Sequence, residues 1–185
     1  MSSADPSADR TRTLVLVHGA GSGPWVFDGW THGSLDLVAV DLHQGVDVGT
    51  ASMRDYCGVV EAACAAARGR VALCGWSIGG LVAMMAAPTV AAGALVVMEP
   101  SAPAEVQGVQ EVPEGSGTFD PEEVYGAFPP GMQARAESSR ARADRKRGIS
   151  VPGLPARSLV VYGDDFEEER GRALVGFYGA QGAHF

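Results

Sequence analysis

The residue in this sequence best suited to covalent chemistry is Ser77, in the segment Gly75-Trp76-Ser77-Ile78-Gly79. The apolar run 71–74 predicts a strand before it, and the apolar stretch 81–87 predicts a helix after it. A serine on such a sharp turn projects its hydroxyl outward, and the flanking glycines remove side chains that would collide as strand and helix pass. In this setting the pattern predicts a nucleophilic serine. The competing interpretation is a glycine-rich turn with an incidental serine.

A second small-residue segment, His18-Gly19-Ala20-Gly21, directly follows the apolar run 13–17. Small residues let the backbone approach a substrate carbonyl, and a loop of this kind supplies one N–H of an oxyanion hole. We expect that N–H to come from Ala20, paired with the N–H of Ile78 just after the nucleophile. These two amides would stabilise negative charge on the substrate oxygen.

The bunched glycines of this loop, Gly19, Gly21 and Gly23, also admit a phosphate-binding interpretation. No Gly-Lys-Ser/Thr ending follows them, and only Asp41 closes the next predicted strand, without clean dinucleotide spacing. The oxyanion interpretation is therefore preferred. His18 precedes the nucleophile and sits in the loop itself, so we expect a structural role for it and not that of the base.

Strands and helices alternate along the chain. This predicts an α/β fold: a three-layer α/β/α sandwich with a mostly parallel sheet. The predicted strands are 13–17, 37–40, 71–74, 95–98 and 159–162, and the predicted helices are 51–68, 81–87 and 167–178.

One stretch breaks this alternation. Residues 101–155 contain no apolar strand and are predicted to form a cap over the carboxyl ends of the strands, where open α/β sheets bind ligands. The core is then 13–100 plus 156–185, after a disordered N-terminal tail, 1–12. Within the cap, 134–147 holds six Arg or Lys and is interpreted as a solvated polar helix.

Composition excludes several classes of partner. The 185 residues carry a net charge of -8, which argues against nucleic acid and anionic membrane surfaces. No apolar stretch is long enough for a signal peptide or a membrane span. The three cysteines are an odd count without metal-like spacing, so we expect reduced thiols, a cytoplasmic protein and no metal.

The segments 14–21, 40–42 and 75–80 together resemble the α/β-hydrolase superfamily in order and spacing. The resemblance covers 12–100 well and 157–178 passably. It implies a reduced form of that fold, lacking the first two strands, with no cofactor. It also implies a serine esterase, lipase or thioesterase acting on a small acyl substrate, whose nucleophile, acid and base follow one another along the chain.

The resemblance places the triad acid after the strand 159–162, three residues beyond Gly163, where Phe166 stands. Asp165 is the nearest carboxylate and the first choice; Asp164 is the alternative beside it. Glu99, at the end of the strand before the cap, is the main rival of Asp165 and ranks ahead of Asp164.

The base should be a histidine on a loop beyond the last strand, and only His184 follows the acid. His184 lies only 19 positions after Asp165, which is too short an interval for a helix, a turn, a strand and that loop. Residues 182–185 would more naturally be the strand itself. Either this is a hydrolase with a compressed end, or the chain stops after its last sheet strand and before its catalytic histidine; the second is favoured.

Three aromatic residues next to the predicted site, Trp25, Phe27 and Trp76, are expected to line the acyl pocket, with core packing as the alternative. The leading function is a serine hydrolase that cleaves a small ester or thioester through an acyl-enzyme on Ser77. The alternatives are a non-catalytic ligand-binding protein on the same scaffold, and an acyltransferase or lyase. The sequence does not determine substrate identity or oligomeric state.

Overall fold

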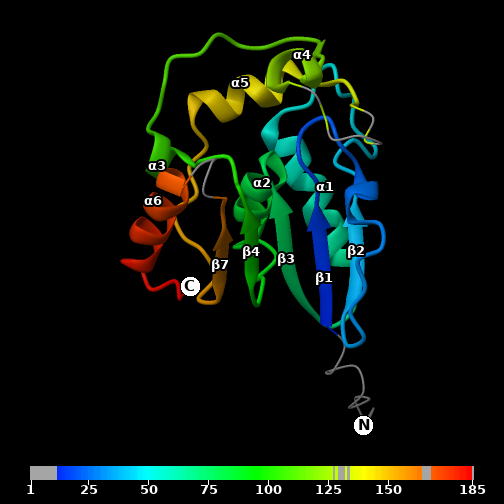
Figure 1. Ribbon diagram of the computed structural model, residues 1–185, viewed down its shortest axis with the longest axis vertical. Helices are drawn as coiled ribbons and strands as arrows, with labels where there is room; N and C mark the ends of the chain where they lie inside the picture. Colours follow the sequence, from blue (N-terminus) through cyan, green and yellow to red (C-terminus); the bar gives the residue numbers. More distant parts are fainter. Residues whose placement is uncertain (1–11, 127, 129–131, 133, 164–167, 185) are drawn as a thin grey trace.

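A five-stranded sheet forms the centre of the molecule (Figure 1). The computed structural model describes residues 12–126, 128, 132, 134–163 and 168–184. All four neighbouring strand pairs are parallel, which confirms the predicted α/β fold. In spatial order the strands are β2 (Asp36–Val40), β1 (Arg12–Val17), β3 (Arg70–Trp76), β4 (Leu95–Met98) and β7 (Ser158–Val161).

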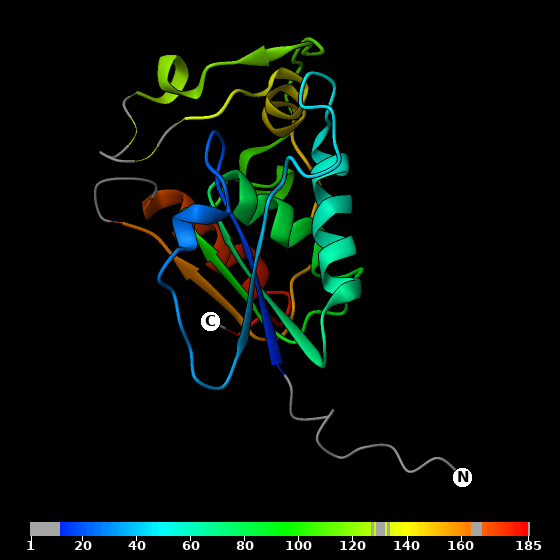
Figure 2. The same ribbon diagram turned by 90° about the vertical axis from the view of Figure 1, so that its right-hand side faces the viewer.

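Alternate residues of each strand face opposite sides of the sheet and build two core clusters. On one face Val15, Leu73 and Val97 pack under the helices α1 (Met53–Ala66), α2 (Ile78–Ala86) and α6 (Glu168–Gly179). On the other face Leu16 and Cys74 pack with Phe27, from the short 3₁₀ helix η2 (Pro24–Phe27). Figure 2 shows α1 and η2 on opposite sides of the sheet.

The helix after the serine begins earlier than its apolar pattern predicts. The pattern predicts 81–87, whereas α2 starts at Ile78. The sequence pattern does not reveal the first turn of α2, because this turn contains Gly79 and Gly80 and glycine has low helix propensity. Both are buried, so tertiary packing and not local propensity sets this boundary.

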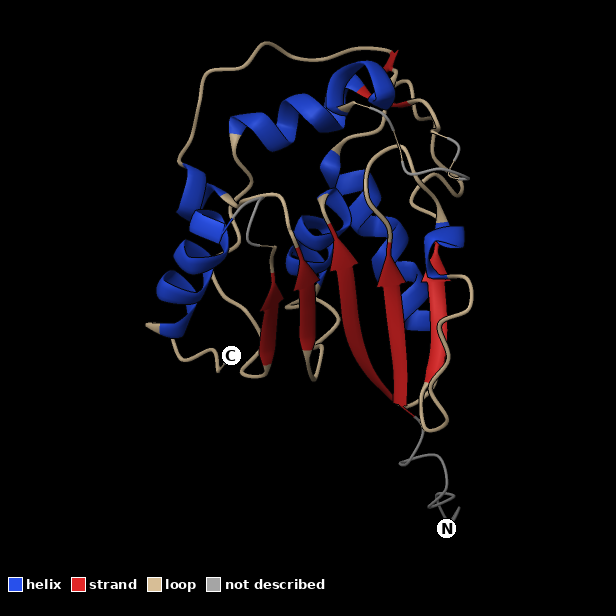
Figure 3. Cartoon of the chain, viewed as in Figure 1, coloured by secondary structure: helices blue, strands red, loops and turns tan. Residues whose placement is uncertain are grey.

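The segment between β4 and β7 crosses the carboxyl ends of the strands (Figures 1 and 3). The strands β5 and β6 pair antiparallel, and α5 packs against α1. The elements of this segment are α3 (Ala104–Gln107), β5 (Thr118–Phe119), α4 (Pro121–Tyr125), β6 (Glu137–Ser138) and α5 (Ser139–Arg147).

The predicted tail, 1–12, lies outside the described residues except for Arg12, which begins β1. Among the helices of the described segments, none is both long and apolar enough to span a membrane.

Candidate active site

Ser77 occupies a strained turn between β3 and α2, with φ 55° and ψ -122°. A residue with a Cβ rarely adopts a positive φ, and such strain concentrates at functional sites. The glycines on either side are required by close backbone contacts. A Cβ on Gly75 would overlap the carbonyl oxygen of Gly79, and a Cβ on Gly79 would overlap the carbonyl oxygens of Val17 and His18. The turn therefore has the geometry expected of a nucleophile elbow.

The predicted oxyanion loop lies against this turn. A Cβ on Gly19 would stand 2.9 Å from the Trp76 ring and 3.2 Å from the Cβ of Ser77. Within the described part of the chain, the N–H groups of Ala20 and Ile78 have no hydrogen-bond partner. Two free donors thus flank the serine, as oxyanion stabilisation requires.

His18 fixes the orientation of one of these donors. The N–H of Leu42 donates to His18 Nε2 at 3.0 Å, so that nitrogen is the acceptor and Nδ1 carries the proton, which it donates to the Gly19 carbonyl at 2.8 Å. Ser22 Oγ donates to the same carbonyl at 2.7 Å. Because the C=O of Gly19 and the N–H of Ala20 point in opposite directions across one trans peptide, holding the carbonyl inward turns the N–H outward.

His18 is fully buried, and both of its nitrogens are occupied. Burial lowers the pKa of His18 below its usual value, although the Gly19 carbonyl and the Asp41 carboxylate act in the opposite direction. The imidazole is therefore neutral and structural, in keeping with its expected role.

Glu99 stands beside the nucleophile at the top of the neighbouring strand. The residues before them, Met98 and Trp76, are paired in register, and the Ser77 N–H donates to the Met98 carbonyl at 3.0 Å. Glu99 has φ 43°, a second strained position, and its carboxylate lies next to Gly163 at the end of β7. The other two candidate acids, Asp164 and Asp165, lie outside the described residues.

His184 lies at the wrong end of the sheet to act as the base. It pairs with Arg157, just before β7, through its own N–H to the Ala156 carbonyl at 2.8 Å. Arg157 is level with residue 72 of β3, five residues before Ser77. At about 3.3 Å per residue this separates His184 from Ser77 by roughly 16 Å along the strands. The assignment of His184 as the base is therefore wrong. The parallel pairing of His184 with Arg157 agrees with the alternative, that this segment is itself a strand.

Among the described residues the Ser77 hydroxyl has no hydrogen-bond partner, and no imidazole is within reach of it. Histidines of this part of the chain are engaged elsewhere: His18 with the oxyanion loop, His32 with Ser34, and His43 with the cap.

The three predicted pocket aromatics take different positions. Phe27 is only 6% exposed and packs with Leu16 and Cys74, so its assignment to the pocket is wrong and the core interpretation holds. Trp76 packs its ring against Gly19. The guanidinium of Arg135 lies 5.3 Å from the centre of the Trp25 ring, a cation–π contact that ties this side chain to the cap. Contact of Trp25 and Trp76 with a substrate stays a prediction.

A polar cluster around the buried Glu137, at the base of the cap, was not predicted from the sequence. Glu137, 1% exposed, contacts His43 and Tyr56, and Arg135 contacts Asp41 and His43. Residues 134–147 were expected to form a solvated helix, but α5 begins at Ser139, and the two residues before it, Glu137 and Ser138, are buried. No local pattern distinguishes a buried Glu in a charged run from an exposed one.

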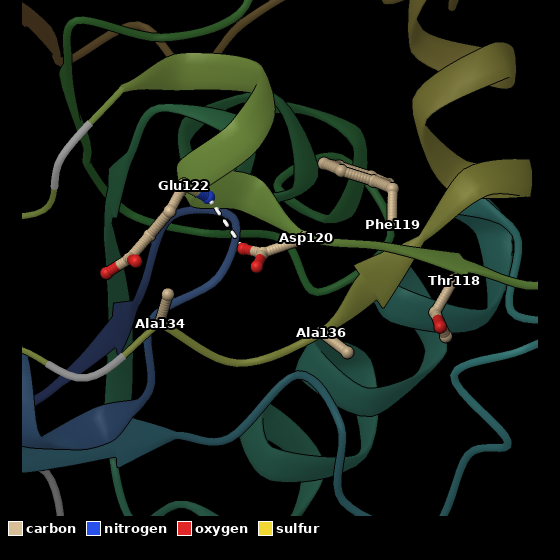
Figure 4. Close-up of a pocket in the computed structure, with 6 residues that line it drawn as sticks. All are labelled: Thr118, Phe119, Asp120, Glu122, Ala134 and Ala136. Carbon is tan, nitrogen blue, oxygen red and sulfur yellow. Dashed lines mark hydrogen bonds between the residues drawn. The ribbon is translucent and has the colours of Figure 1, made fainter.

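A separate hollow of about 460 Å³ opens within the cap, lined by Phe119 and by polar and small side chains (Figure 4). Its Asp120 carboxylate accepts a hydrogen bond from the Glu122 N–H at 2.9 Å, which caps α4. Within the described residues, no group of three or more His, Cys, Asp or Glu side chains is arranged to hold a metal ion.

Comparison with known proteins shows which family this chain belongs to. The sequence profile of the alpha/beta hydrolase family matches residues 14–183, which is most of the chain. The chain belongs to the alpha/beta hydrolase family. No curated protein sequence matches it.

Three solved structures illustrate the likeness in fold. Polyneuridine aldehyde esterase is 17% identical with a TM-score of 0.58, covering 91% of this chain and 88% of that one. Est1E from Butyrivibrio proteoclasticus is 17% identical with a TM-score of 0.57, covering 92% and 75%. The pyrethroid hydrolase PytH is 17% identical with a TM-score of 0.55, covering 94% and 100%. At this identity the likeness concerns the alpha/beta hydrolase fold alone.

Proposed function

We propose that this chain is a serine hydrolase that cleaves a small ester or thioester through an acyl-enzyme on Ser77. The observation that carries the proposal is the strained turn at Ser77 with two amides beside it, of Ala20 and Ile78, that have no partner among the described residues. A strained backbone conformation such as that of Ser77 persists only where the surrounding structure enforces it. Here the close backbone contacts at Gly75 and Gly79 do so.

In the proposed reaction Ser77 Oγ forms a bond to the substrate carbonyl carbon, and the carbonyl oxygen becomes an oxyanion. The Ala20 and Ile78 N–H groups donate to that oxygen, supported by the positive end of α2. The proton of Ser77 passes to a base, which returns it to the leaving oxygen or sulfur as the tetrahedral intermediate collapses, so that the alcohol or thiol departs. Water then hydrolyses the acyl-enzyme by the same steps.

The acid of the triad is proposed to be Asp165 or, failing that, Asp164 or Glu99. Glu99 gains support from its place beside Ser77 and its strained backbone. The base is not among the imidazoles of the described residues. An oxyanion hole acting without a base still accelerates acyl transfer by about 10³–10⁴ over water.

The second candidate is a ligand-binding protein on the same scaffold, and the position of His184 favours it. Without a base Ser77 would be a weak nucleophile, because loss of one triad member costs about 10⁴- to 10⁶-fold in rate. The free amides would still bind acyl carbonyls. An acyltransferase or lyase would use the same turn with a different acceptor.

Labelling with a fluorophosphonate, read by intact mass, decides between the first two candidates. A hydrolase gives one adduct, mapped to Ser77 by peptide digestion and absent from Ser77→Ala. The exposed Ser34→Ala serves as the matched control and should label like the natural chain. Absence of any adduct on the natural chain would reject the hydrolase and leave the binding protein.

A further inference from the structure

Glu137 is a buried carboxylate that the proposed reaction does not use, yet it reaches the oxyanion loop. It comes from β6 of the cap, and its Oε2 accepts a hydrogen bond from the Gly21 N–H at 3.3 Å. Two residues earlier in the same cap segment, the Arg135 N–H donates to the Gly21 carbonyl at 2.7 Å, on the other side of this glycine. The cap therefore holds both polar groups of Gly21.

Donors from the core and from the cap itself hold the carboxylate in turn. Tyr56 of α1 donates its hydroxyl to Glu137 Oε1, and the N–H of Ser138 donates to the same oxygen at 2.8 Å. His43 Nε2 lies 3.3 Å from both carboxylate oxygens. Together these donors favour one rotamer of a side chain that is 1% exposed.

The protonation of His43 follows from its other neighbour. Arg135 lies 2.7 Å from His43 Nδ1, and a guanidinium can only donate, so Nδ1 is the acceptor and Nε2 carries the proton that goes to Glu137. Arg135 is also paired with Asp41 at 3.0 Å. Burial acts to raise the pKa of Glu137, but the hydrogen bonds from His43 and Tyr56 outweigh it and hold the pKa below its ordinary value. The carboxylate is therefore ionised.

The peptide group that Glu137 binds is adjacent to the one that carries the proposed oxyanion donor, the Ala20 N–H. The N–H of Gly21 belongs to the Ala20–Gly21 peptide, and His18 with Ser22 fixes the preceding Gly19–Ala20 peptide. Two consecutive peptide planes are then set, one by the core and one by the cap. Gly21 itself has φ 71°, and Pro121 of α4 packs where its Cβ would be, so the cap lies directly against this loop.

We propose that Glu137 is a positioning residue, which holds the oxyanion loop in its reactive conformation and makes that conformation depend on the docked cap. The proposal rests on the proposed function, because the direction of the Ala20 N–H matters only if it binds a developing oxyanion. The Gly21 amide and the reactivity of Ser77 would then both depend on the Glu137 side chain, which touches neither Ser77 nor the substrate carbonyl.

The test compares the natural full chain with Glu137→Gln. The matched control is Glu105→Gln, since Glu105 also accepts a backbone N–H, from Val151, and a hydroxyl, from Ser150, but away from the loop. Two quantities are measured: hydrogen exchange of the Gly21 amide by NMR, and the concentration dependence of Ser77 labelling by a fluorophosphonate.

In Glu137→Gln we expect Gly21 to exchange at least about tenfold faster, while core amides of β1 and β3 keep their rates. The limiting labelling rate should fall about 10- to 100-fold with the half-saturating probe concentration unchanged, as for a misplaced donor. Glu105→Gln should leave both quantities within about twofold of the natural chain, because its carboxylate does not reach the loop.

Unchanged Gly21 exchange in Glu137→Gln would overturn the proposal, and so would faster exchange with an unchanged labelling rate. A natural chain that does not label at all rejects the proposed function, and Gly21 exchange still decides whether Glu137 holds the loop. If Glu137→Gln does not fold, Glu137→Asp replaces it. That variant keeps the charge but is one methylene too short for the 3.3 Å contact, and the same results are expected.

Discussion

At the scale of single residues, contacts from distant parts of the chain determine which side chains are allowed around Ser77. Gly79 faces the carbonyl oxygens of Val17 and His18, which end β1. These are backbone atoms that cannot move aside without breaking the pairing of β1 with β3. Gly19 likewise lies close to Ser77. The candidate site can therefore form only because both positions lack a side chain.

Gly79→Ala should therefore destabilise the protein strongly. We expect a loss of about 3 kcal/mol or more in the free energy of unfolding, from overpacking against fixed backbone. Gly58→Ala is the matched control: Gly58 lies inside α1 with open space around its Cβ position, so this change should stabilise by about 0.5–1 kcal/mol. Urea unfolding measures both, and a Gly79→Ala loss below about 1 kcal/mol would contradict the close approach.

At the scale of elements, the junction between β6 and α5 joins the cap to the core. Ser138 is fully buried; its hydroxyl donates to the Ala51 carbonyl at 2.5 Å and accepts from the Ala141 N–H at 3.1 Å. One side chain thus starts α5 and ties it to the segment that leads into α1. Glu137, the residue before it, carries the contact to the oxyanion loop.

Ser138→Ala should cost about 2 kcal/mol of unfolding free energy, because it removes a helix N-cap and leaves a buried carbonyl without its donor. Ser52→Ala is the comparison, since Ser52 caps α1 in a capping box with Asp55 but does not bridge cap and core. It should cost about 1 kcal/mol. Denaturant unfolding gives both values. Equal losses in the two variants would mean that the bond to Ala51 contributes nothing.

At the scale of the whole molecule, buried ionisable groups link stability to pH. Burial depresses the pKa of His18 in the folded state below its ordinary 6.5. The unfolded chain then binds more protons as pH falls below 6.5, so stability is present above that pH and is lost below it. Glu137, with a folded pKa below its ordinary 4.5, adds a second loss in the same direction at lower pH.

We expect the unfolding free energy to be nearly constant from pH 8 to 7 and to fall below pH 6.5, with a slope of at most about 1.4 kcal/mol per pH unit from His18. Urea titrations at pH 8, 6.5 and 5 measure this. His18→Gln should flatten the fall between pH 6.5 and 5, whereas His32→Gln, at an exposed site, should keep it. A fall that persists in His18→Gln would assign the linkage to another group.

The sequence by itself determined the parallel α/β core and the turn at Ser77, because both depend on local patterns. Unbroken apolar runs mark strands buried on two faces, and glycines around a serine mark a sharp strand-to-helix turn. Ala20 and Ile78 were predicted as oxyanion donors by their places in these patterns, and the structure leaves both amides free among its described residues. The choice between Asp165 and Glu99 stays a prediction.

Only the tertiary structure decided where His184, Phe27 and Glu137 lie. Pairing with Arg157 places His184 at the far end of the sheet from Ser77, since strand register is set by the partner and not by the residue. Phe27 entered the core because η2 lies on the sheet face beside Leu16. Glu137 sits in a run that is charged in sequence, and its burial depends on donors from His43, Tyr56 and the oxyanion loop, which the fold alone brings together.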